Sequence, residues 1–188
     1  MNNSTPKVEH ALDQTIEELL KHDYRRDRLS QGLFLLATDL NEHLKTESCE
    51  SEFERLYRET KRSQPEWVID ELDRANLPLG FAESAIDGDV ELIPFDDPQV
   101  DHEWLMYPGN DFFEVIVRQY YPVICGENSL QALANQTRTD KNLVRDGALL
   151  LMGGIGAGGL PWVPLCALIA LHIIEENVDH VCEEYEPY

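Results

Sequence analysis

The feature that most constrains this chain is one long apolar stretch near its C-terminus. Residues 147–174 read GALLLMGGIGAGGLPWVPLCALIALHII and contain no Asp, Glu, Lys or Arg over 28 positions. A stretch of this length without charge has to leave water, inside the protein, against a partner or in a bilayer. The chain around it is acidic, with 36 Asp and Glu against 15 Lys and Arg in 188 residues.

The composition of the stretch favours two packed helices. Five glycines fall within residues 153–159, and two prolines follow. Because glycine and proline disfavour a continuous helix, we expect one helix to end near Met152 and a second to begin near Trp162. The second keeps an apolar stripe after the charges resume, which is typical of a helix packed on protein. The predicted element is a buried or partner-facing hairpin whose turn is marked by Gly153, Gly156, Gly158, Pro161, Trp162 and Pro164.

A membrane element is the alternative interpretation of residues 147–174. Their length exceeds the roughly 20 residues that a transmembrane helix needs. Arg138, Lys141 and Arg145 precede the stretch, and six acidic residues without a base follow it. This asymmetry would leave the N-terminus in the cytoplasm. The chain would then be a membrane-anchored or membrane-inserting effector.

The remaining sequence predicts a mainly α fold in one compact domain. Residues 1–76 carry apolar stripes at helical spacing and predict an N-terminal helical region. The segment from about 77 to 110 is acidic and rich in proline and glycine, so we expect an irregular arm with at most one short edge strand, in VELIPF. Helices return over 111–188, the first capped by Asp111 and ended by Pro122. The expected fold is a helical bundle with this arm and the apolar hairpin.

The net charge of -21 is unevenly placed and points to a basic protein partner. Residues 1–74 hold 11 basic and 17 acidic side chains, whereas residues 75–188 hold four and 19. This balance argues against binding to nucleic acid and favours a basic surface as the match. Halophilic adaptation is the alternative reason for such a charge. The predicted partner-binding residues are Asp96, Asp97, Asp101 and Glu103 in the arm, with Trp162 in the hairpin.

Chemistry-bearing motifs are weak in this sequence. His172, Glu176 and His180 are spaced four apart and would share one helical face, where imidazole and carboxylate could ligate zinc or iron. They lack the HExxH order, and a solvated acidic helix produces the same pattern. A metal-dependent hydrolase is therefore a weak alternative, and no cofactor is expected. The favoured prediction is a non-enzymatic adaptor, inhibitor or other regulatory protein.

The four cysteines predict free thiols. Cys49, Cys125, Cys166 and Cys182 show no CxxC spacing. If Cys166 and Cys182 share one helix, they lie about 24 Å apart and cannot form a bridge. The first residues, MNNSTPKVEHAL, are polar and do not resemble a signal peptide. We therefore expect reduced cysteines in a cytoplasmic protein, with the oligomeric state left open.

Overall fold

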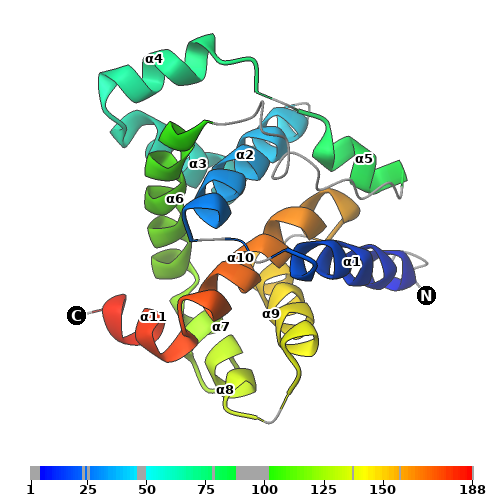
Figure 1. The fold of residues 1–188 in the computed structure, drawn as a ribbon. Coiled ribbons are helices and arrows are strands. Elements are labelled where there is room, and N and C mark those ends of the chain that lie inside the picture. The colour runs from blue at the N-terminus through cyan, green and yellow to red at the C-terminus, as the bar shows by residue number, and fades with distance from the viewer. Residues whose placement is uncertain are drawn as a thin grey trace.

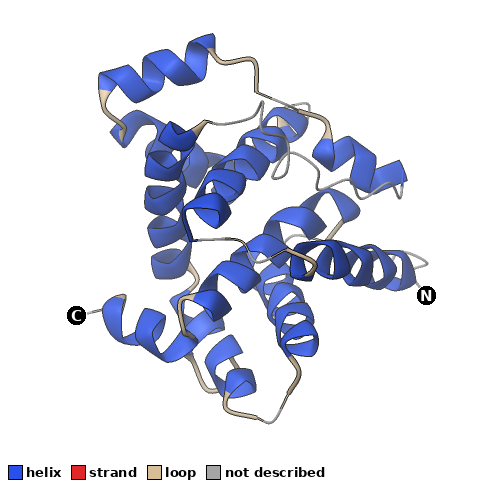
Figure 2. Cartoon of the chain, in the orientation of Figure 1, coloured by secondary structure: helices blue, strands red, loops and turns tan. Residues whose placement is uncertain are grey.

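The computed structural model describes residues 5–22, 24, 26–45, 50–77, 79–87, 102–136, 138–156 and 158–187. Every regular element in these ranges is a helix, which confirms the mainly α prediction (Figure 2). In chain order they are α1 (Thr5–Leu20), α2 (Arg26–Leu44), α3 (Glu52–Ser63), α4 (Glu66–Arg74), α5 (Phe81–Asp87), η2 (Glu103–Leu105), α6 (Met106–Gln119), α7 (Tyr121–Cys125), α8 (Leu130–Ala134), α9 (Asp140–Ile155), η3 (Leu160–Trp162), α10 (Val163–Glu175) and α11 (Val178–Glu184).

Helix α10 is the centre of the fold. It runs through the middle of the molecule and contacts α9, α2 and α1 (Figure 1). Every residue from Val163 to Ile173 is buried, on all sides of the helix. A helix that is apolar all round is stable in water only when its neighbours cover it. The uncharged stretch of the sequence therefore supplies the core helix of the protein.

The other half of the stretch belongs to α9. Helices α9 and α10 are bent by 120° relative to each other, so the stretch is two helices and not one. Gly156 follows the last residue of α9 with φ of 74°, the left-handed conformation that favours glycine. Among the described helices, none alone is long and apolar enough to cross a membrane, although α9 and residues 160–175 pass as a bent pair on length and composition.

Helix α2 forms the second layer of the core and packs against α6. An aromatic cluster joins them, in which Phe34 contacts Tyr57 of α3 and Phe112 of α6. The two helices approach closely at Gly109, where any side chain would collide with the backbone carbonyl of Ser30. The lack of a side chain at position 109 therefore sets the distance between α2 and α6.

The expected irregular arm is partly helical. Helix α5 lies within it, and its N-terminus is held by Asp39, whose carboxylate accepts hydrogen bonds from the backbone N–H groups of Gly80 and Ala82. Helix α6 begins at Met106, before the predicted cap at Asp111. Its first turn includes Pro108, which is tolerated because the first backbone N–H groups of a helix have no partner within it. Residues 88–101, which include VELIPF, lie outside the described part of the chain.

Pro122 also differs from its predicted role. It lies in the first turn of α7 and so begins a helix after α6 has ended at Gln119. Most of the buried apolar residues form one cluster that extends from Ala11 in α1 to Tyr185 after α11.

Candidate functional site

His172 is a buried polar residue in the core helix α10. Its side chain packs against the ring of Phe113, with 4.1 Å between the centroids. Its Nε2 atom lies 3.0 Å from Ser30 Oγ, and the Ser30 hydroxyl donates to Asn110 Oδ1 at 2.5 Å. Because the serine proton is used toward Asn110, Ser30 Oγ accepts from an Nε2–H group of His172. This leaves His172 Nδ1 as a hydrogen-bond acceptor.

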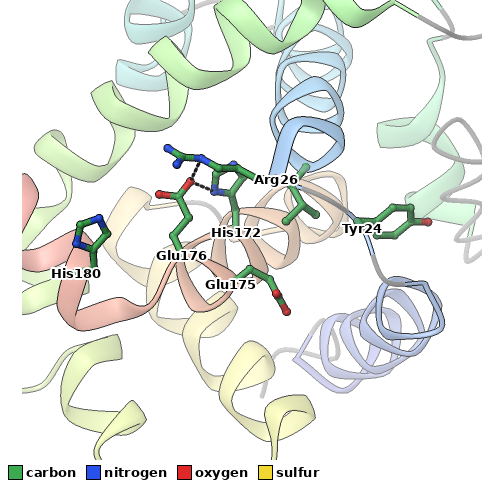
Figure 3. Close-up of a pocket in the computed structure, with 7 residues that line it drawn as sticks. Tyr24, Arg26, His172, Glu175, Glu176 and His180 are labelled. Atoms are coloured by element: carbon green, nitrogen blue, oxygen red, sulfur yellow. Dashed lines mark ion pairs between the residues drawn. The ribbon is translucent and has the colours of Figure 1, made fainter.

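Glu176 lies beside this acceptor at the C-terminus of α10. Its Oε1 atom is 3.3 Å from His172 Nδ1 and 2.8 Å from Nε of Arg26 (Figure 3). The contact with Arg26 is an ion pair, and neither His172 Nδ1 nor Glu176 Oε1 makes a hydrogen bond with the described residues. Two acceptors thus face each other, and a single proton on either group would join them.

Burial shifts both groups toward their neutral forms. Burial, and then the charge of Arg26, lowers the pKa of His172 to about 4. Burial also raises the pKa of Glu176, while Arg26 opposes that shift. The imidazole is consequently neutral at neutral pH, as expected for a buried histidine beside a positive charge.

A pocket of about 230 Å³ lies next to this pair. Figure 3 shows the side chains around it, which come from the α1–α2 connection, from α2 and from the C-terminal helices. The lining residues are Tyr24, Arg26, Leu29, His172, Glu175, Glu176 and His180.

The order Ser30, His172, Glu176 resembles a nucleophile, a base and an acid that orients the base. A catalytic serine must reach the substrate. Ser30 is fully buried, and its hydroxyl is hydrogen-bonded to Asn110 at the contact between α2 and α6. Ser30 is therefore part of a hydrogen-bond network inside the core and is not exposed to a substrate.

The prediction that His172, Glu176 and His180 share one helical face is wrong. Helix α10 ends at Glu175, and Asn177 has φ of 70°, which starts α11 in a new direction. His180 therefore lies on α11, where it is mostly exposed and 3.6 Å from Glu184. Within the described residues, no group of three His, Cys, Asp or Glu side chains could hold a metal ion.

The same break at Asn177 explains the cysteines. Cys182 lies on α11 and forms a disulfide with Cys125 of α7, with 5.6 Å between their Cα atoms. The prediction of reduced thiols is wrong for these two residues, and so is the single helix shared by Cys166 and Cys182. Cys166 stays in α10 as a buried free thiol, and burial raises its pKa to about 12. Cys49 lies outside the described residues. The bridge removes the reason for placing the chain in a reducing compartment.

The predicted partner-binding residues fall in three environments. Asp96, Asp97 and Asp101 lie outside the described part of the chain. Glu103 is exposed on η2. Trp162 is half-buried, and its ring contacts Phe53 edge-on at 5.1 Å, so it packs on the protein's own core.

The residues predicted to mark the hairpin turn are distributed over the α9–α10 connection. Gly153 lies inside α9, and Gly156 is its positive-φ C-terminal residue. Gly158 does not have a positive φ. Pro161 belongs to η3, and Pro164 is buried in the first turn of α10.

An exposed aromatic pair lies between α4 and α6. Trp67 of α4 and Tyr107 of α6 are 50% and 49% exposed, respectively. Their rings meet edge to face, with centroids 5.6 Å apart and an angle of 84° between the planes. Sequence analysis misses the pair because its members are distant in the chain. The sequence signal for an exposed Trp67 is its position next to Val68, the residue that α4 buries.

Acidic residues follow and precede the two aromatic residues at helical spacing. On α4, Asp70 and Glu71 follow Trp67 by three and four residues, which places them on its side of the helix. On the α6 segment, Glu103 and Asp111 lie one turn before and one turn after Tyr107. We call this set the aromatic–acidic surface: Trp67, Asp70, Glu71, Glu103, Tyr107 and Asp111.

Comparison of the chain with protein-family models, with curated protein sequences and with solved structures gave no match.

Proposed function

We propose that this chain is a non-enzymatic regulatory protein, an adaptor or inhibitor, that binds a basic partner protein through its acidic surface. The observation that carries the proposal is that the few basic residues of the C-terminal region form ion pairs within the chain. All four basic residues of the region 75–188 already pair with carboxylates of the same chain. The pairs are Arg118–Glu114 at 3.0 Å, Arg138–Asp146, Lys141–Glu17 at 2.6 Å and Arg145–Asp13 at 3.1 Å.

Only two of these four pairs, Arg118–Glu114 and Arg138–Asp146, use a carboxylate of this region, which carries 19 acidic residues. Two of the four bases even pair with acids of α1. A partner that offers Lys and Arg would neutralise the remaining charge and would be attracted over a distance of about 10 Å at about 0.1 M salt. This electrostatic match acts mainly on the rate of association.

The arrangement around His172 supports binding over catalysis. Ser30 is the group that would have to attack a substrate, and it is enclosed between α2 and α6. The membrane alternative would require α10 to exchange its contacts with α1, α2 and α9 for lipid. Binding of a partner requires neither change.

The test uses the full chain and two immobilised synthetic peptides of equal length, one basic and one acidic. We expect the basic peptide to bind, with an association rate that falls as salt rises. Substitution of Asp96, Asp97 and Asp101 by Asn should weaken binding without lowering the melting temperature.

A matched control substitutes three other acidic residues, Glu127, Glu183 and Glu186, by Gln, which changes the net charge equally. We expect this control to keep more of the affinity than the arm variant does. Binding that is the same at low and high salt, or absent at low salt, would contradict the proposed function.

A further inference from the structure

We propose that the aromatic–acidic surface binds an arginine side chain presented by the basic partner. This inference rests on the proposed function and adds the place and the chemistry of the contact. The two rings carry the apolar part of the contact, and the carboxylates of the surface carry the charge.

The rings are available because α4 does not need them to stay in place. Val68 is the fully buried residue of α4, and Leu72 of the same helix is partly buried against the hydrophobic core. Lys61 of α3 adds an ion pair with Asp73 of α4, with 3.0 Å between nitrogen and oxygen. Trp67 and Tyr107 meanwhile leave about half of their area exposed. Large rigid aromatic side chains of this kind dominate the binding energy of many protein interfaces.

The geometry of the pair suits a planar cation. An edge-to-face contact uses one of the four ring faces, and each side chain still leaves about half of its area exposed to a ligand. A guanidinium group stacks on such a face, and tryptophan is the strongest aromatic partner for a cation. The guanidinium group also carries five N–H donors, and a carboxylate can accept two of them at once.

The carboxylates of the surface have capacity for such a donor. Asp70 lies 3.7 Å from the mostly exposed guanidinium of Arg74, which is a long ion pair. Asp111 is exposed and accepts a hydrogen bond from the side-chain amide of Gln64 at 2.7 Å. The sequence has no Lys or Arg between Arg74 and Arg118, so the segment that carries Glu103 and Tyr107 has no base of its own. Charge and ring faces therefore attract the same ligand, and arginine fits both better than lysine does.

The experiment compares two basic peptides of equal length and charge, one with Arg and one with Lys at every basic position. Binding to the full chain is measured by calorimetry. We expect the Arg peptide to bind more tightly, and Trp67→Ala to weaken its binding about tenfold. Trp67→Phe, which keeps a weaker aromatic face, should lose less. The matched control is Leu79→Ala, because Leu79 is 53% exposed and lies outside the surface.

Three results would overturn the inference. The first is equal affinity of Trp67→Ala and the unchanged chain for the Arg peptide, and the second is equal affinity of the unchanged chain for both peptides. Both leave the proposed function intact if binding still falls with salt. The third is that sedimentation shows self-association that Trp67→Ala abolishes while peptide binding is unchanged, since the occupant would then be a second copy of the chain. Failure of the unchanged chain to bind either peptide at low salt contradicts the proposed function itself.

Discussion

Helices α10 and α4 are both predicted by sequence patterns, yet they lie in opposite environments. Helix α10 is buried on every side from Val163 to Ile173, whereas α4 buries only Val68 among its nine residues. Figure 1 shows α10 in the middle of the molecule and α4 at its periphery. The difference suits the two helices to different roles. Burial of α10 supplies stability, and α4, with one buried residue, could take part in the proposed recognition without weakening the core.

The sharpest way to break this comparison is to truncate one large side chain in each helix. Leu168→Ala in α10 should lower the free energy of unfolding by about 2–5 kcal/mol, because it leaves a cavity in a closely packed core. Trp67→Ala in α4 should change it by less than about 0.5 kcal/mol. Urea denaturation measures both free energies of unfolding, provided that the dependence on urea concentration has the same slope in each variant. Comparable losses would mean that α4 is part of the stability core.

A pH titration tests the polar exception within α10. The folded pKa of His172 is about 4, below the ordinary value of 6.5, so the unfolded chain takes up the proton first. Stability from the neutral imidazole is therefore complete above pH 6.5 and is lost as the pH falls toward 4. The loss is at most about 3 kcal/mol. Glu176, with its raised pKa, takes up a proton more readily in the fold and reduces that loss.

The measurement is urea denaturation of the unchanged chain and of His172→Gln at several pH values in this window. We expect the stability of the unchanged chain to decrease more steeply on acidification than that of the variant. Parallel curves would show that His172 does not titrate differently in the folded and unfolded states.

Gly109 links the packing of the core to the aromatic–acidic surface. It sets the approach of α6 to α2, and Tyr107 lies two residues earlier on α6. Gly109→Ala should cost about 1–3 kcal/mol of stability, since its side chain collides with backbone and not with a movable side chain. It should also weaken binding of the Arg peptide by displacing Tyr107. The matched control is Gly153→Ala in α9, which has open space around it and should be neutral or stabilising by up to about 1 kcal/mol. Equal melting temperatures for the two variants would contradict the close contact.

The smallest expected effect distinguishes two glycines of the α9–α10 connection. Gly156→Ala should destabilise the protein by about 1 kcal/mol, because alanine is strained at φ of 74°. Gly158→Ala should change stability by less than about 0.5 kcal/mol, since its φ is not positive and nothing lies within 4 Å. Thermal unfolding of the two single variants checks this. A stabilised Gly156→Ala would indicate that α9 continues past Ile155.

The helices with clear apolar periodicity could be predicted from the sequence. Helix α1 buries Leu12, Ile16 and Leu19 at helical spacing, and α2, α3 and α4 lie within the predicted helical region 1–76. Helix α9 ends at Ile155, close to the expected Met152. Helix α5 could not be found this way, because it buries only Ala82 and Ala85. Its N-terminus depends on Asp39, which is 41 residues away in the chain. Local patterns do not report such contacts.

The site was less predictable because it depends on where the chain turns. A single residue, Asn177, ends the shared helical face on which the metal prediction depended, and it brings Cys182 to Cys125. Asparagine tolerates a positive φ, but this tolerance alone does not reveal a break. The contact of Trp67 with Tyr107 likewise arises from the packing of α4 beside α6. Glu103 is exposed, and its role in binding a partner stays a prediction.

The disulfide between Cys125 and Cys182 has a consequence for limited proteolysis. It closes a covalent loop that contains the whole α9–α10 connection, where Gly156 and Gly158 are exposed. A protease that cuts between those glycines would produce two fragments still joined through sulfur. The nicked protein should therefore run as one band on a gel without reductant and as two bands with it. It should also retain α10 within the core, because the fragment that carries this helix cannot diffuse away.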